Sequence, residues 1–201
     1  MAIRKIAQLG EPLLRQIAAP VPLGELGGGR FQALIDDMIE TMRDADGAGL
    51  AAPQIYEPFR LAVIEVNQNP RYPNVEPVPL TVLVNPVVTP DVESSDALDR
   101  TDAVEMYEGC LSVPGVRGRV RRPRRVRVTA IDRAGRALDF TWEGVRAAIV
   151  QHELDHLDGV LFVDRADPKT LTFLREYERH VPVERRILDR GQPVLGAPKA
   201  S

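Results

Sequence analysis

Residues 151–156, Gln-His-Glu-Leu-Asp-His, constrain the fold of this chain more than any other stretch. At 3.6 residues per turn, His152 and His156 project about 40° apart from one helix face, so both imidazoles can bind one ion. Val145 and Ile149 precede them at helical spacing and place the histidines in line with an apolar stripe. An adjoining stripe consists of Val150, Leu154 and Leu157. The pattern predicts a helix with little solvent-facing surface, around which the rest of the chain packs.

Such a helix supplies two ligands and a general base for a hydrolytic metal site. Glu153, next to the first histidine, can serve the water that the ion activates. A third protein ligand is needed, and Cys110, the only cysteine in the chain, is the candidate. His180 lies in the polar C-terminal region and is not expected to take part. Two alternatives stay open, namely core histidines satisfied by hydrogen bonds and a cysteine that is only a small buried hydrophobe.

Residues 47–54, Gly-Ala-Gly-Leu-Ala-Ala-Pro-Gln, form a third notable element. One interpretation is a helix C-cap followed by a turn and a packed strand. The other is a binding segment, because glycines let the backbone approach a ligand closely and Gln54 offers an amide donor.

The remaining pattern predicts a single α+β body, and 44% hydrophobic residues are enough for its core. Residues 1–29 are rich in proline and glycine and predict an extended arm, whereas residues 31–45 predict an amphipathic helix. Strands are expected at 61–66 and 81–88, and a β-hairpin at 125–132 and 138–142. We expect mixed β-strands packed around a central metal-binding helix, plus the N-terminal helix.

The connections 67–79 and 90–102 are predicted loops. Residues 1–165 are the predicted catalytic domain, and residues 166–201 a C-terminal helix near 171–178 and a loosely ordered tail.

The net charge of −3 and a pI near 5.7 give no general argument for binding nucleic acid or a membrane. One local basic run alternates with valines and fits the solvated face of strands, although an RNA-rich partner such as a ribosome could use it. Its members are Arg117, Arg119, Arg121, Arg122, Arg124, Arg125 and Arg127. A single cysteine excludes an internal disulfide and suits a reducing compartment. With no apolar run of membrane-spanning length and no signal-like N-terminus, a cytoplasmic protein is expected.

Taken together and in this order, residues 47–54, Glu-Gly-Cys-Leu-Ser at 108–112 and Gln-His-Glu-Leu-Asp-His at 151–156 resemble the three-motif signature of the peptide deformylase family. The resemblance implies a metal-dependent hydrolase that removes the formyl group from the N-terminal formylmethionine of newly synthesised proteins. It also implies a mixed α+β fold.

The resemblance carries over to individual residues. Cys110, His152 and His156 match the metal ligands, and Glu153 matches the catalytic acid/base. The Gln54 amide and the Leu111 backbone N–H match the oxyanion donors. The residues expected to contact substrate are Gly49, Ala48, Gly109, Met106, Arg117, Val145, Ala148 and Ile149. The expected cofactor is one divalent metal, Fe²⁺ in the cell, with Zn²⁺, Ni²⁺ or Co²⁺ in a purified sample.

Two other functions share some of this pattern. A metalloendoprotease has the same helix motif but usually takes a histidine or glutamate as its third ligand. A noncatalytic zinc-bearing module associated with the ribosome would have a closed site. For the deformylase, the expected partners are formyl-Met nascent peptides with a transient ribosome contact, no membrane and no specific DNA.

Overall fold

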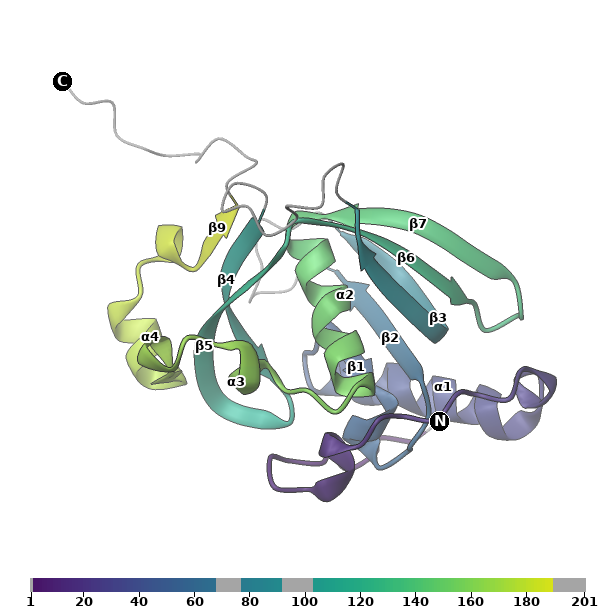
Figure 1. Cartoon of the computed structure of the whole chain (residues 1–201). Helices are drawn as coiled ribbons and strands as arrows, with labels where there is room; N and C mark the ends of the chain where they lie inside the picture. The colour runs from purple at the N-terminus through teal and green to yellow at the C-terminus, as the bar shows by residue number, and fades with distance from the viewer. Residues whose placement is uncertain (1, 68–76, 92–102, 190–201) are drawn as a thin grey trace.

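The computed structural model describes residues 2–67, 77–91 and 103–189, and across these ranges a pair of antiparallel sheets encloses one helix (Figure 1). The five-stranded sheet has the order β1 (Gly49–Ala51), β2 (Leu61–Val66), β3 (Val78–Pro90), β6 (Arg125–Ile131) and β7 (Ala137–Glu143). The four-stranded sheet has the order β8 (Thr172–Phe173), β5 (Val113–Pro123), β4 (Ala103–Cys110) and β9 (Ile187–Asp189). Helix α2 (Gly144–Leu157) runs between them, so the predicted α+β fold around a central helix is confirmed.

Helix α2 is buried over most of its length, as the double apolar stripe predicted. Its apolar side chains pack against the five-stranded sheet, with Ala147, Val150 and Leu157 all fully buried. Gly159 follows the helix with a φ of 74°. Only a residue without a Cβ takes this left-handed conformation at no cost, so Gly159 ends the helix as expected.

Helix α1 (Gly29–Asp44) covers the lower side of the molecule in Figure 1 and agrees with the predicted helix at 31–45. Its buried face includes Phe31, Ile35 and Met38, which join a core cluster with residues of β1 and β2. After the helix, Asp46 turns the chain in a left-handed conformation toward the glycine-rich segment.

The predicted β-hairpin is also confirmed, as β6 and β7 pair from Arg125 opposite Glu143 to Ile131 opposite Ala137. The turn between them uses Gly135 at a φ of 84°. In that turn, the Asp132 carboxylate accepts hydrogen bonds from two backbone N–H groups, those of Ala134 and Arg136.

The N-terminal arm contains two 3₁₀ turns (Pro12–Arg15 and Leu23–Glu25) and is hydrogen-bonded to the segments that carry the sequence motifs. The Ala7 N–H donates to the Gln54 carbonyl at 2.7 Å, and the Leu9 N–H donates to the Ser112 carbonyl at 2.8 Å. The arm therefore fixes the backbone of two motif segments relative to each other.

The C-terminal region differs from the sequence prediction. The helix expected at 171–178 is α4 (Leu174–His180), preceded by the short strand β8, and α3 (Phe162–Arg165) lies further upstream. Strand β9, which pairs with β4, was not predicted. Most of the two predicted loops, at 67–79 and 90–102, and the tail after residue 189 lie outside the described residues.

Candidate active site

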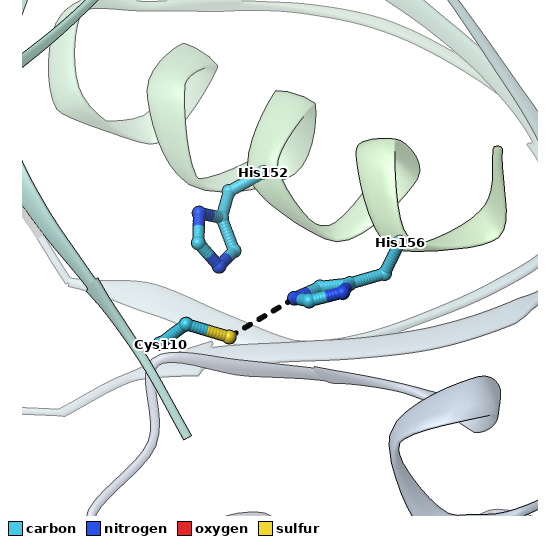
Figure 2. A group of neighbouring side chains, drawn as sticks. All are labelled: Cys110, His152 and His156. Carbon is cyan, nitrogen blue, oxygen red and sulfur yellow. Dashed lines mark hydrogen bonds between the residues drawn. The ribbon is translucent and has the colours of Figure 1, made fainter. Parts of the chain in front are cut away.

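The three motifs meet beside helix α2. Cys110 is the last residue of β4, and a register irregularity against β5 lies between Glu108 and Cys110. His152 and His156 project toward it from consecutive turns of α2 (Figure 2). The ligand atoms of all three side chains lie within 4.8 Å of one another, and the Cys110 Sγ is 3.1 Å from the His156 Nε2. Two imidazoles and a thiol thus converge on one point, as the sequence predicted.

The Cys110 thiol lies among groups that favour its ionised form. Burial favours the neutral thiol, but the charge and hydrogen bonds of His156 and His152 outweigh it and lower the pKa of Cys110 well below its ordinary value. The Ser112 backbone N–H also donates to the sulfur, at 3.4 Å. A thiolate is the form in which cysteine binds a metal.

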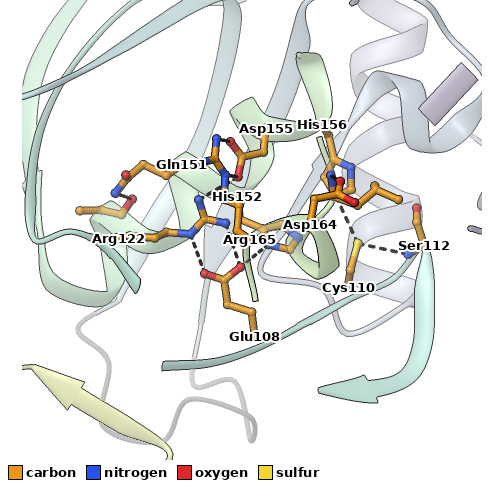
Figure 3. A network of polar contacts seen from close by, with 12 residues as sticks. Glu108, Cys110, Ser112, Arg122, Gln151, His152, Asp155, His156, Asp164 and Arg165 are labelled. Atoms are coloured by element: carbon orange, nitrogen blue, oxygen red, sulfur yellow. Dashed lines mark hydrogen bonds and ion pairs between the residues drawn. The ribbon is translucent and has the colours of Figure 1, made fainter. Parts of the chain in front are cut away.

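Glu108 orients His152 from behind (Figure 3). Its Oε2 is 2.8 Å from the His152 Nδ1, so an Nδ1–H donated to this carboxylate leaves Nε2 for the ligand side. Burial raises the pKa of Glu108, but the Arg122 guanidinium, with a smaller contribution from His152, lowers it to about 2. Glu108 is therefore a carboxylate at neutral pH. Burial also disfavours a charged imidazole, yet Cys110 and Glu108 raise the pKa of His152 well above its usual value. The negative charges of Cys110 and Glu108 therefore favour a positive charge beside the His152 ring.

A buried charge network continues from Glu108. Arg122 binds both Glu108 oxygens, at 2.6 and 2.9 Å, and Asp155 at 2.8 Å, and its side chain is only 3% exposed. Arg165 binds both Asp155 oxygens at 2.7 Å. The prediction that the whole basic run is solvated was therefore wrong for Arg122. Its strand places it on the face of β5 that packs on the site.

Glu153 lies beside the histidine pair with one oxygen free. Its Oε2 is buried and has no hydrogen-bond partner among the described residues. Burial raises the pKa of Glu153 to about 7, although the nearby histidines act in the opposite direction. Gly49 provides the space for this carboxylate, because a Cβ at Gly49 would be 2.5 Å from the Glu153 Oε1.

Gln54 is held in place by three contacts. Its Oε1 accepts a hydrogen bond from the Ala51 N–H at 2.8 Å. Its Nε2 donates to the Ser112 Oγ at 3.1 Å and lies 3.5 Å from the Cys110 Sγ. The amide N–H₂ group is therefore fixed beside the sulfur.

A pocket opens between these elements and collects most of the predicted residues. Thirteen residues line it, namely Gly47, Ala48, Gly49, Gln54, Met106, Glu108, Gly109, Cys110, Leu111, Ala148, Ile149, His152 and Glu153. Of the predicted substrate-contacting residues, Val145 packs next to the pocket rather than lining it. Arg117 lies across the backbone at Gly109, where an added Cβ would be 2.0 Å from its Nη1. The roles of Gly47 and Glu108 in the lining were not predicted from the sequence.

Comparison with known proteins identifies the family to which this chain belongs. The family model described as polypeptide deformylase matches residues 3–171, which is most of the chain. The chain belongs to the polypeptide deformylase family. A peptide deformylase of Leptospira biflexa is 43% identical over 190 residues, covering 94% of this chain and all of the relative. Peptide deformylase 1 of Nitrosomonas europaea is 42% identical over 175 residues, covering 87% and 91% of the two chains.

Solved deformylase structures share the fold. The class I type b peptide deformylase of Acinetobacter baumannii with Met-Ala-Ser bound superposes with a TM-score of 0.74 at 38% identity, covering 82% of this chain and 98% of that one. A peptide deformylase of Synechococcus elongatus in complex with actinonin has a TM-score of 0.69 at 35% identity, covering 84% and 81%.

As a polypeptide deformylase, the chain is a hydrolase that removes N-terminal formyl groups, and this prediction is confirmed. The metalloendoprotease and noncatalytic alternatives are therefore set aside. None of the described helices has the length and hydropathy needed to span a membrane.

The residues present fit the divalent metal that this family implies. The Cys110, His152 and His156 cluster offers one sulfur and two ring nitrogens, a donor set typical of zinc and iron-group metals. A carboxylate with a free buried oxygen stands next to it, and a cation is favoured at this point by the thiolate and by Glu108.

Proposed function

We propose that this chain removes the formyl group from the N-terminal formylmethionine of newly synthesised proteins, a step of N-terminal processing in protein biosynthesis. The observation that carries the proposal is the buried carboxylate oxygen of Glu153, which has no partner among the described residues. It lies beside a Cys110, His152 and His156 cluster, of which Cys110 and His152 line the pocket. A structural metal site would have no use for a carboxylate held there without a partner.

Cys110, His152 and His156 would hold the metal. When bound, a divalent ion makes water acidic enough to ionise near neutral pH and polarises a carbonyl group. We propose ferrous iron in the cell, with Zn²⁺, Ni²⁺ or Co²⁺ satisfying the same ligands in a purified sample. An iron-thiolate centre is oxidisable, so the activity is expected to be lost in air.

We assign the proton transfer to Glu153. Its free carboxylate oxygen accepts the proton of the attacking water, and the carboxyl group then delivers that proton to the departing amine. The negative charge that develops on the formyl oxygen needs hydrogen-bond donors, and we assign them to the Gln54 amide and the Leu111 backbone N–H, both on the pocket wall. The contacts of Gln54 with Ala51 and Ser112 keep its amide group oriented before substrate arrives.

The peptide backbone of the substrate fits as an added strand. β1 is one of the two edge strands of its sheet, and the register of β9 with β4 runs from Val104 to Met106 and stops short of Gly109. Backbone groups at Ala48, Gly49 and Gly109 therefore border the pocket from two sides, an arrangement that suits β-augmentation.

The methionine side chain is assigned to the apolar wall of the pocket. Met106, Ala148 and Ile149 line that wall, with Val145 packed beside them. We assign to Arg117, which lies across Gly109, a contact with the peptide further along.

The cellular setting follows from the substrate. We propose a cytoplasmic enzyme that meets nascent chains through transient contact with the ribosome, without membrane or specific DNA partners. Residues 1–165 are proposed as the catalytic domain and 166–201 as an appended C-terminal segment. The basic run lends little support to a ribosome-binding surface, because Arg125 and Arg127 pair with acidic neighbours.

The test begins with anaerobic purification, metal analysis and formate release from formyl-Met-Ala. Glu153→Ala should keep the metal and lose nearly all turnover, whereas Cys110→Ala and His152→Ala should lose metal and turnover together. His180→Ala is the matched control, because the His180 side chain is 66% exposed, and it should change neither. Full turnover by the Glu153 variant would refute the assigned mechanism. Iron content and rate that both survive storage in air would refute the iron assignment.

A further inference from the structure

The C-terminal strand β9 lies against the wall of the pocket. In the β4 to β9 pairing, Ile187 stands directly opposite Met106. Opposed residues of an antiparallel pair present their side chains on the same face, so Ile187 points toward the side on which Met106 lines the pocket. Figure 1 shows β9 beside β4, at the end of the molecule away from α1.

Ile187 packs directly on a small apolar cluster at that wall. The cluster consists of Val104, Met106 and Ala148, with Ile187 and Val145 packed against it. Met106 and Ala148 also line the pocket, whereas Ile187 does not. Ile187 therefore packs beside the pocket wall, on its β9 side, without lining the pocket itself.

The contact with Ile187 matters because of the two pocket-lining residues that it packs against. Ala148 is small, and Met106 has an unbranched side chain with three rotatable bonds that fits itself to available space. The Met106 side chain can shift out of the pocket when no side chain packs against it. A half-buried, stiff β-branched side chain at 187 limits that movement.

The segment that carries Ile187 is fixed by specific contacts. The Tyr107 N–H donates to the Arg186 carbonyl at 3.0 Å. The Arg186 guanidinium lies 4.8 Å from the centre of the Tyr177 ring in α4, and that ring packs at 5.3 Å on Tyr107. Arg186 thus joins β9 to both α4 and β4, so the position of Ile187 is set by the fold.

We infer that Ile187 is a specificity-determining residue, which restricts the pocket to a side chain of the width of methionine. This inference rests on the proposed function, since it assumes that the first side chain of the substrate occupies this pocket. It assigns a role in substrate selection to a segment that follows the family-matched residues 3–171.

The measurement is the ratio of kcat/KM for formyl-Met-Ala to that for formyl-Phe-Ala. In Ile187→Ala, Met106 gains room to move aside toward β9, and we expect the ratio to fall about tenfold, chiefly because the phenylalanine substrate improves. Ile187→Val removes only one methylene and should give a smaller fall in the same direction. The control is Leu188→Ala, on the same strand but opposite Glu105 and hence on the other face.

The outcomes separate the inference from the function on which it rests. No formate release from formyl-Met-Ala by the unaltered protein with its metal would refute the proposed function. Normal release with an unchanged ratio in both Ile187 variants would overturn only the inference, as would an equal fall in the Leu188 variant. If Ile187→Ala does not fold, as judged by circular dichroism, the Ile187→Val ratio decides.

Discussion

Replacing Arg122 with methionine should destabilise this enzyme far more than replacing any of its surface arginines. Arg122 is 3% exposed and lies between two buried carboxylates, those of Glu108 and Asp155. Methionine has a similar length and is apolar, so Arg122→Met removes the positive charge and the hydrogen bonds without opening a large cavity.

The size of the effect follows from what is left behind. The variant loses two hydrogen bonds to Glu108 and one to Asp155. Asp155 keeps both bonds from Arg165, whereas among the described residues Glu108 keeps only its contact with His152. Removing one partner of a buried ion pair typically costs about 3–5 kcal/mol, because the other charge stays buried and uncompensated. We expect a loss of stability in this range, mostly through Glu108.

Urea unfolding of the metal-loaded proteins measures this loss. With a slope of about 3 kcal/mol per molar urea, the midpoint should fall by roughly 1–2 M. Arg127→Met is the matched control, since the pair of Arg127 with Asp139 is exposed, and its midpoint should not move. The double variant Arg122→Met with Glu108→Gln should recover some of the loss, because the unpaired charge is gone. Equal midpoints for Arg122→Met and Arg127→Met would refute the reasoning.

Three further substitutions test the site and the core. Gly49→Ala should fold normally but lower formate release about 100-fold, because the new Cβ would displace the Glu153 carboxylate that it meets at 2.5 Å; a rate near that of the unaltered enzyme would contradict this. Gln54→Ala should lower kcat by about 10²- to 10³-fold through loss of an oxyanion donor, and an effect on KM alone would argue against that role. Phe162→Ala removes a side chain that is 1% exposed and should cost about 3–5 kcal/mol in urea unfolding, whereas Phe173→Ala, 72% exposed, should leave the midpoint in place.

Helix α2 and its histidines could be predicted because the decisive signals are local. A spacing of four residues on an apolar stripe needs no knowledge of the rest of the fold. The β6 to β7 hairpin was predictable for the same reason, since two β-rich stretches flank one glycine turn. Nothing in the spacing between residues 110 and 152 sets the distance between them in the fold. That Cys110 lies beside His152 and His156 was therefore expected only from the chemistry of metal ligands and from the resemblance.

Arg122 carries a local signal of its own burial. Along β5 the buried residues alternate from Gly118 to Val120 to Arg122, so strand periodicity alone places Arg122 on the inner face. The density of arginines in this run favours a solvated face, which is why the alternation did not lead to a prediction that Arg122 is buried. An arginine in phase with buried residues such as Gly118 and Val120 indicates a buried carboxylate partner elsewhere, which here is Glu108.

Strand β9 could not be predicted from its own residues. It is three residues long and follows a polar stretch, and its partner β4 lies some eighty positions earlier in the chain. Ile187 joins the sheet because β4 offers an unpaired edge there and because Arg186 packs on Tyr177. Both conditions arise only in the folded chain, where tertiary context decides the state of so short a segment.

The charges around α2 explain why a metal cation suits this site. The carboxylates of Glu108 and Asp155 are balanced by the guanidinium groups of Arg122 and Arg165. The Cys110 thiolate remains without a paired arginine or lysine among the described contacts, and burial raises the pKa of the neighbouring Glu153 to about 7. Buried charge is tolerated only when it is compensated, so the arginine network leaves the Cys110 thiolate to be balanced by the metal. Binding of the ion should therefore stabilise the fold as well as supply the chemistry.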